Sequence, residues 1–193
     1  DGVNLGGVRA SNLTAVIPDY SKEKLLIDAD IKGPGKAVGP YFDETPLKDS
    51  LGATLQELQF DGDVNARLHL DIPLNGELVT AKGEVTLRNN SLFIKPLDST
   101  LKNLSGKFSF INGDLQSEPL TASWFNQPLN VDFSTKEGAK AYQVAVNLNG
   151  NWQPAKTGVL PEAVNEALSG SVAWDGKVGI DLPYHAGATY NVE

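Results

Sequence analysis

The residues that could do chemistry are few and lie far apart along the chain. The 193 residues include two histidines, His69 and His185, and no cysteine. The lack of cysteine excludes disulfides, zinc–thiolate sites, iron–sulfur clusters and cysteine nucleophiles. His69 lies between Leu68 and Leu70 on the polar side of an alternating segment, and His185 follows a Pro-Tyr pair typical of a turn. We expect both to be solvated side chains and not ligands or bases.

Two close pairs of carboxylates, Asp28 with Asp30 and Asp61 with Asp63, are the other candidates. Paired carboxylates can bind calcium or hydrolyse a glycoside. Residues two apart on a strand share one face, and Asp-Gly-Asp is typical of a turn, so surface positions are expected for all four. An enzyme acting on envelope polysaccharide would need convergent carboxylates in a pocket, and the sequence shows no such constellation.

The net charge limits the classes of partner that the chain can be expected to bind. Sixteen Lys and Arg against 24 Asp and Glu give a net charge of −8, which disfavours charge-driven binding to nucleic acid or to an anionic membrane surface. No metal or cofactor motif is present. The chain lacks Met and opens within a strand-like run, so we expect a piece of a longer protein. No signal peptide and no run of roughly 18 apolar residues is found, and any anchor is expected outside this piece.

The elements that must position these residues are β-strands. Apolar and polar residues alternate with period two over most of the chain, which places apolar side chains on one face of a sheet. Turn signals such as Asn75-Gly76 and Asp175-Gly176 separate the runs. The pattern predicts about a dozen antiparallel strands in a long meander. By itself it also fits an ordinary closed sandwich or barrel.

The apolar positions of these runs form a single predicted face. If the sheet is open, they line a groove, and the predicted lining residues are Leu68, Leu70, Ile72, Val85, Leu87, Phe108, Phe110, Trp124, Val131, Phe133, Val144, Val146, Leu148, Val172, Trp174, Val178, Ile180 and Leu182. The three tryptophans, Trp124, Trp152 and Trp174, fit either packing in the core or stacking against a ligand.

Two segments break the alternation and predict short helices. Leucines at positions 47, 51, 55 and 58 form a helical stripe behind Thr45 as N-cap and Pro46 at the first helical position, which predicts a helix over 46–58. A second helix is predicted over 161–168, with Val164 on its apolar face and Gly170 at its end. Each is expected to lie on the sheet as a lid or plug.

The two helices mark an internal repeat. Similar strands ending in Gly33 and Gly150 precede them, and Asp-Ile-Pro ending at Pro73 and Asp-Leu-Pro ending at Pro183 follow them. These elements recur after 117 and 110 residues, so residues 1–193 form a single segment with approximate units 1–110 and 111–193, the second truncated. A repeating sheet can extend at both ends and need not close.

Four strings, in their order and spacing, resemble the large periplasmic AsmA-like proteins of the YhdP type in Gram-negative bacteria. They are Asn90-Ser91-Leu92-Phe93-Ile94, Leu104-Ser105-Gly106-Lys107-Phe108, Ala122-Ser123-Trp124-Phe125-Asn126 and Leu168-Ser169-Gly170-Ser171-Val172-Ala173-Trp174. The likeness is strongest over 62–193. It implies an all-β fold with two short helices, in which an elongated antiparallel sheet curves into an open U-shaped hydrophobic groove.

The resemblance also implies a function. The parent would be anchored in the inner membrane, reach across the periplasm and move phospholipid between inner and outer membranes, supporting the outer-membrane barrier. A dozen strands at about 4.8 Å spacing make a trough of roughly 55 Å, longer than the roughly 30 Å hydrocarbon layer of a bilayer. Acyl chains could slide along such a floor, which is expected to be uniform, without any chemistry. The alternative is a non-enzymatic scaffold that binds envelope proteins through its sheet edges and purifies without lipid.

Three Asn-X-Ser/Thr triplets give little information about function. Asn12-Leu13-Thr14, Asn89-Asn90-Ser91 and Asn103-Leu104-Ser105 match the N-glycosylation signal, which arises often by chance.

Overall fold

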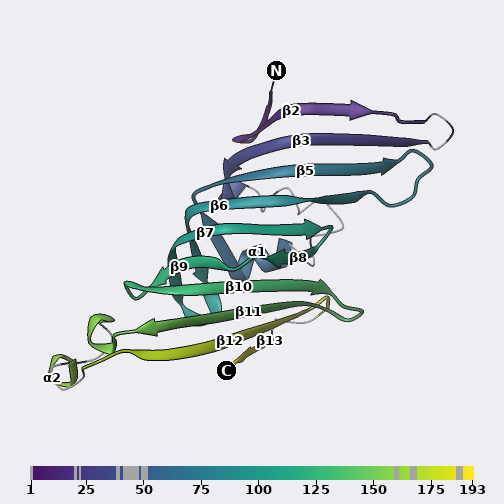
Figure 1. The fold of residues 1–193 in the computed structure, drawn as a ribbon. Coiled ribbons are helices and arrows are strands. Elements are labelled where there is room, and N and C mark those ends of the chain that lie inside the picture. The colour runs from purple at the N-terminus through teal and green to yellow at the C-terminus, as the bar shows by residue number, and fades with distance from the viewer. Residues whose placement is uncertain are drawn as a thin grey trace.

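The sheet predicted from the alternation is present in the computed structural model, which describes residues 2–19, 21, 23–37, 40, 48, 52–158, 161–165, 169–185 and 189–193. Within these residues thirteen strands form one antiparallel sheet (Figure 1), as expected from the sequence. The strands are β1 (Val3–Leu5), β2 (Val8–Val16), β3 (Lys24–Pro34), β4 (Leu58–Asp61), β5 (Asp63–Pro73), β6 (Thr80–Ile94), β7 (Ser99–Ile111), β8 (Asp114–Ser117), β9 (Leu120–Trp124), β10 (Gln127–Glu137), β11 (Ala141–Trp152), β12 (Val172–Pro183) and β13 (Thr189–Val192).

The strands follow a meander from one end of the sheet to the other. The order is β1-β2-β3-β5-β6-β7-β8-β10-β11-β12-β13, while β4 pairs with β6, and β9 pairs with β7 and β10. The first and last strands therefore lie at opposite ends of an elongated sheet (Figure 1). Short turns explain most of this order, because strands joined by them pair with their neighbours in sequence. The pairs β3–β5 and β11–β12 form across longer segments that contain the two helices.

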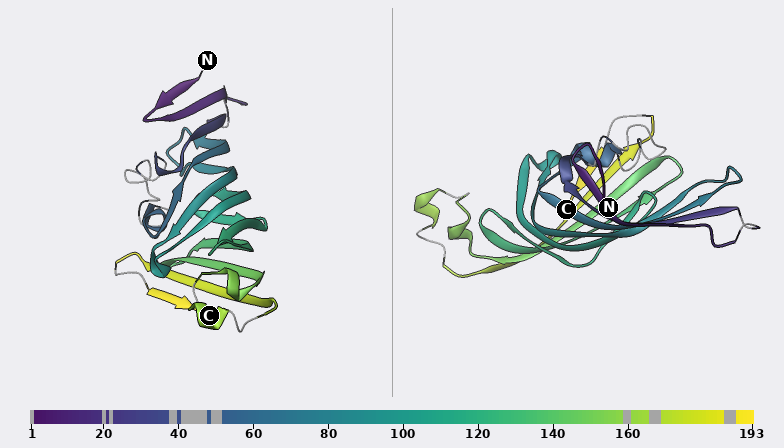
Figure 2. Two further views of the ribbon diagram at one scale, coloured as in Figure 1. Left: turned by 90° about the vertical axis from the view of Figure 1, so that its left-hand side faces the viewer. Right: turned by 90° about the horizontal axis from the view of Figure 1, so that it is seen from above.

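The sheet is curved, and its bulges coincide with three asparagines. Asn12, Asn89 and Asn103 have φ angles of 51°, 53° and 52°, and the strand register shifts beside each of them. Asparagine tolerates this left-handed conformation better than most residues, and a bulge bends its strand and increases the local twist. The Asn89 N–H donates to Ser105 Oγ at 2.9 Å, which places the bulges of β6 and β7 side by side. Figure 2 shows the resulting concave sheet.

Valine in place of Asn89 is expected to lower the free energy of unfolding by about 1–3 kcal/mol, because a β-branched side chain is strained at positive φ. Glycine adopts this conformation freely, so Asn89→Gly is expected to stay within about 0.5 kcal/mol of the parent chain. Urea unfolding of both variants measures the difference. If glycine destabilises as much as valine, the backbone conformation is not the reason for the asparagine.

Asn90 explains how β6 changes partner along its length. Its side chain is 1% exposed, and its Nδ2 donates to the carbonyl oxygens of Asp61 at 3.1 Å and Asp63 at 3.0 Å. Its Oδ1 accepts the N–H of Arg88 at 2.8 Å. These bonds hold the junction at Gly62 against β6, so β5 pairs with the first part of β6 and β4 with the last part.

The first helix ends one residue earlier than predicted, and its described part lies on the sheet. Helix α1 spans Ala53–Glu57, and Leu58 begins β4, so the predicted end at Leu58 is wrong. The residues predicted to begin this helix and carry its stripe, Thr45, Pro46, Leu47 and Leu51, lie outside the described part of the chain. Leu58 belongs to the buried cluster of the sheet, Ala53 packs against that cluster, and Figure 2 shows α1 on the concave side.

The second helix does not cover the sheet. Helix α2 spans Glu162–Asn165 within the predicted range, and residues 166–168 lie outside the described part. It lies beyond the ends of β11 and β12, and Val164 is 43% exposed (Figure 1). The chain leaves the sheet at the end of β11 through a 3₁₀ turn, Pro154–Lys156, and α2 packs against that turn. The expectation of a lid is therefore wrong here.

Candidate functional site: the inner face of the sheet

The strand register places all the predicted lining residues on one face of the sheet. Val85 pairs with Phe108, and Phe133 pairs with Val146, which in turn pairs with Val178. The rings of Phe108 and Phe133 have centroids 5.3 Å apart and connect the two halves. We call the face that carries these five residues the inner face. It is the concave side, and apolar positions follow one another along it from β3 to β12.

Exposure divides the inner face into two parts. The buried lining residues are Val85, Leu87, Val131, Val144, Val146, Leu148, Val178, Ile180 and Leu182. The half-buried ones are Leu68, Leu70, Ile72, Phe108, Phe110, Trp124, Phe133 and Trp174, while Val172 is 54% exposed. The inner face is accessible over β5 and closely packed over β10–β12. The expectation of a uniform floor is therefore wrong.

Helix α1 links two distant parts of the sheet across this packed region. Glu57 Oε2 accepts a hydrogen bond from the Tyr190 hydroxyl on β13 at 2.7 Å, and its Oε1 lies 3.6 Å from Lys95 Nζ, just after β6. The bond to the Glu57 carboxylate holds the pKa of Tyr190 above its ordinary value. Leu58, which follows α1, belongs to the buried cluster of the inner face, and Ala53 packs against that cluster.

The outer face is polar and carries cross-strand ion pairs. His69 Nδ1 lies 2.8 Å from Asp28 Oδ1, and Arg67 Nε lies 3.5 Å from Asp30 Oδ1. This confirms the surface assignment of His69 and of the first carboxylate pair. His185 lies in the turn after β12, as predicted. Such exposed pairs contribute little to stability.

The second carboxylate pair is also at the surface. Asp61 and Asp63 are exposed on either side of Gly62, where β4 ends and β5 begins. The Gly62 N–H donates to the Asp61 carboxylate at 2.9 Å and, together with nearby Lys36, holds the pKa of Asp61 below its ordinary value. Among the described residues, no group of three or more His, Asp or Glu side chains could hold a metal ion.

The tryptophans meet in one aromatic cluster with a residue that the sequence did not single out. Trp124, Phe125, Trp152 and Trp174 lie at the ends of β9, β11 and β12, and we call them the aromatic corner. The ring centroids of Trp152 and Trp174 are 4.5 Å apart, and those of Trp124 and Phe125 are 5.0 Å apart. The three tryptophans also pack against the buried cluster, which confirms a packing role for them. The sequence Trp-Phe-Asn, with an aromatic residue in a hairpin turn, is the signal that could have identified Phe125.

Two of the three indole N–H groups donate hydrogen bonds, and the third has no partner among the described residues. Trp124 Nε1 donates to Ser99 Oγ at 2.5 Å, and Trp152 Nε1 donates to the Pro128 carbonyl at 2.7 Å. Trp174 Nε1 is buried and has no hydrogen-bond partner among the described residues. Gly150 allows the two indoles to approach, because a Cβ there would lie 2.9 Å and 3.0 Å from the Nε1 atoms of Trp152 and Trp174.

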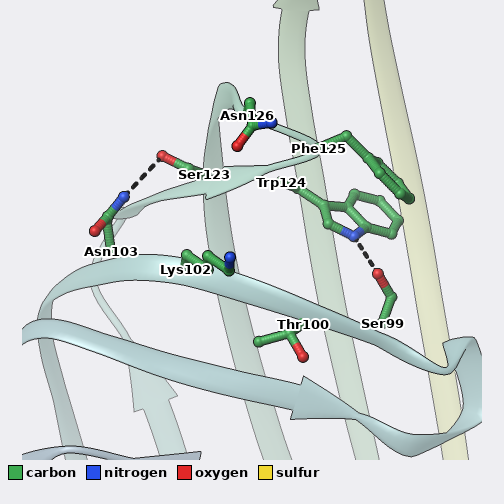
Figure 3. A pocket seen from close by; sticks show the side chains of 8 residues that line it. All are labelled: Ser99, Thr100, Lys102, Asn103, Ser123, Trp124, Phe125 and Asn126. Atoms are coloured by element: carbon green, nitrogen blue, oxygen red, sulfur yellow. Dashed lines mark hydrogen bonds between the residues drawn. The ribbon is translucent and has the colours of Figure 1, made fainter. Parts of the chain in front are cut away.

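A cleft of about 440 Å³ lies beside the aromatic corner, between β7 and the end of β9. Figure 3 shows Trp124 and Phe125 on one side of it, Asn103 and Ser123 on the other, and Lys102 between them. Asn103 Nδ2 donates to Ser123 Oγ at 3.3 Å. The cleft therefore joins a cation and small polar groups to an aromatic wall that borders the inner face.

Comparison with known proteins identifies the family to which the chain belongs. The family described as YhdP protein matches the whole chain, residues 1–193. The chain is 98% identical over 193 residues to a protein of Escherichia coli (strain K12) named intermembrane phospholipid transporter YhdP, and it spans 15% of the length of that relative. No solved structure matches the chain significantly. None of the described helices is long and apolar enough to cross a membrane.

Proposed function

Because the chain belongs to the YhdP family, we propose that it is one segment of a bridge-like transporter that shields phospholipid acyl chains as they move between the inner and outer membranes. The observation that carries this proposal is the apolar inner face, which continues from strand to strand through the register. The polar outer face keeps the segment in water. We propose the periplasm as its location, with the membrane anchor in the remainder of the parent protein.

The dimensions of the sheet suit this task. Along the main path, strands spaced by about 4.8 Å extend over roughly 48 Å, more than the roughly 30 Å hydrocarbon layer of a bilayer. Burial of each CH₂ group of an acyl chain is favourable by about 0.8 kcal/mol, whereas the headgroup is best left in water. A groove that is open along one side satisfies both requirements. Such a groove supplies no direction of its own, so any direction of transfer has to come from elsewhere.

The unequal exposure of the inner face suggests where acyl chains lie in this segment. Leu68, Leu70 and Phe110 are half-buried and form the accessible part of the floor. Over β10–β12, the same face is buried in a cluster that also contains Leu58 of β4 and against which Ala53 of α1 packs. We propose that chains lie on the accessible part and that passage over β10–β12 requires α1 to move away from the inner face.

We also propose that residues 1–110 and 111–193 are successive units of the groove. Lys24 pairs with Pro73 and Gly33 with Val64, whereas Ala141 pairs with Pro183 and Gly150 with Trp174. In both strand pairs, the glycine lies nine residues after the residue that pairs with the proline: Gly33 after Lys24, and Gly150 after Ala141. An identical register around each helical insertion supports a duplicated unit.

Site-specific photo-crosslinking in the full-length E. coli relative tests the proposed function. A crosslinker at Leu70 is expected to capture phospholipid, because Leu70 lies on the accessible inner face. One at Arg67, whose side chain is 84% exposed on the outer face of the same strand, is expected to capture none. Mass spectrometry of the adducts identifies the lipid. Equal capture at both positions would contradict a groove that holds lipid on one face.

A further inference from the structure

The cleft beside the aromatic corner contains a lysine and no carboxylate, although the chain as a whole is acidic. None of its eight lining residues is acidic, although the chain carries 24 Asp and Glu and a net charge of −8. Among the described residues, Lys102 takes part in no ion pair, in contrast to Lys95 and Lys107, which face Glu57 and Glu84. An anionic group could therefore approach Lys102 without meeting a carboxylate in the cleft.

The turn that forms the aromatic wall departs from ordinary turn chemistry. Phe125 and Asn126 connect β9 to β10 with φ angles of 47° and 59°. Two-residue turns of this kind favour Asn, Asp and Gly, and a bulky residue at positive φ is rare. The Phe125 ring nevertheless lies over Trp124 at an interplanar angle of 27° and is 42% exposed. A strained position occupied by an exposed aromatic ring is typical of a binding site.

Trp124 connects the cleft to the inner face. Its ring lines the cleft, packs against the buried cluster of the sheet and donates its indole N–H to Ser99, another lining residue (Figure 3). A ligand could therefore place a polar end in the cleft and an apolar end past Trp124 on the inner face. Hydroxyl and amide groups of Thr100 and Asn126 complete the polar lining.

We propose that this cleft binds the phosphodiester group of a phospholipid, with Lys102 as the cation and Trp124 and Phe125 against the glycerol and the first methylene groups. The proposal rests on the proposed function and adds a headgroup subsite to it. Charge-assisted hydrogen bonds from an ammonium group favour a phosphate oxygen, and the aromatic rings favour the adjoining apolar part of the same molecule.

The three tryptophans make the site directly observable. All of them lie in the aromatic corner, so tryptophan fluorescence, excited selectively over the five tyrosines of the chain, reports on this region. Titration with dihexanoylphosphatidylglycerol below its micelle concentration is expected to shift this fluorescence saturably. Lys102→Glu is expected to weaken binding at least about tenfold, because it places a carboxylate beside the phosphate. Lys136→Glu on β10 makes the same change in net charge and is expected to leave binding unchanged.

A second variant separates binding from folding. Phe125→Gly suits the positive φ of the turn and removes the exposed ring, so the chain should remain folded while binding weakens about fivefold. Far-ultraviolet circular dichroism and urea unfolding check the fold. Wild-type affinity in both Lys102→Glu and Phe125→Gly would overturn the proposal.

Two further probes identify the ligand group. Inorganic phosphate that competes as strongly as the lipid would indicate a free-anion site, and dihexanoylglycerol that binds equally well would indicate apolar contact without phosphate recognition. Either result overturns the proposal. If the crosslinker at Leu70 captures phospholipid while both variants bind normally, the subsite fails and the proposed function stands. If Leu70 captures none, the proposed function fails first.

Discussion

Aspartate in place of Leu70 is expected to slow phospholipid transfer by roughly two orders of magnitude while the protein remains folded. Leu70 lies on the accessible inner face, opposite Ile27 and Ala81, and is only half-buried. A carboxylate there must lose water whenever an acyl chain passes, and burying an unpaired ion is unfavourable by several kcal/mol. A barrier raised by about 3 kcal/mol slows passage about a hundredfold.

The measurement is the arrival of pulse-labelled phospholipid at the outer membrane in cells that depend on the full-length relative carrying the change. Asn65→Asp is the matched control, because Asn65 lies on the outer face of the same strand, opposite Lys32. Both proteins must reach wild-type abundance. A Leu70→Asp protein that is abundant and transfers lipid normally would mean that lipid does not travel over this face.

The same substitution at Val146 is expected to act on stability instead. Val146 is 5% exposed and belongs to the buried cluster that includes Val178, with Phe133 packed against it. An unpaired carboxylate in that cluster is expected to lower the free energy of unfolding by about 4 kcal/mol, a large part of the stability of a typical domain. Amide exchange across β10–β12 should rise with it.

Ala145→Asp provides the comparison for Val146→Asp. Ala145 is the outward neighbour on β11 and is exposed, so its replacement is expected to change stability by less than about 0.5 kcal/mol. Urea unfolding of the two variants measures the difference. Equal and small effects would show that the inner face over β10–β12 is not closely packed and is open to lipid like the region around Leu70.

Much of the sheet could be predicted because strand periodicity is a local property. Side chains alternate between faces regardless of the partner strand, so runs such as 64–72 and 142–148 already separate inner from outer positions. Short turns also determine most of the meander, while β3–β5 and β11–β12 pair across longer segments. His69, Asp28 and Asp30 were assigned to the polar face by the same alternation.

The bulges could not be predicted from the same signal. Asn12, Asn89 and Asn103 begin strings that match a glycosylation pattern, yet each occupies a left-handed position where a strand bends. Whether an asparagine takes that conformation depends on the register of the neighbouring strand, which local sequence does not contain. The curvature of the groove was therefore visible only in the assembled sheet.

The amino-acid sequence alone determined which side chains share a face, because alternation along a strand depends on backbone geometry and on nothing distant. Only the tertiary structure decided which part of that face is filled and which is accessible. Val146 and Leu70 have the same pattern in sequence, but Val146 belongs to the buried cluster that includes Leu58 of β4, with Ala53 of α1 packed against it, and Leu70 does not. The aromatic corner has the same origin, since the register of β11 and β12 sets Gly150 opposite Trp174 and brings distant rings together. Burial is a property of long-range contacts, so no local pattern contains it.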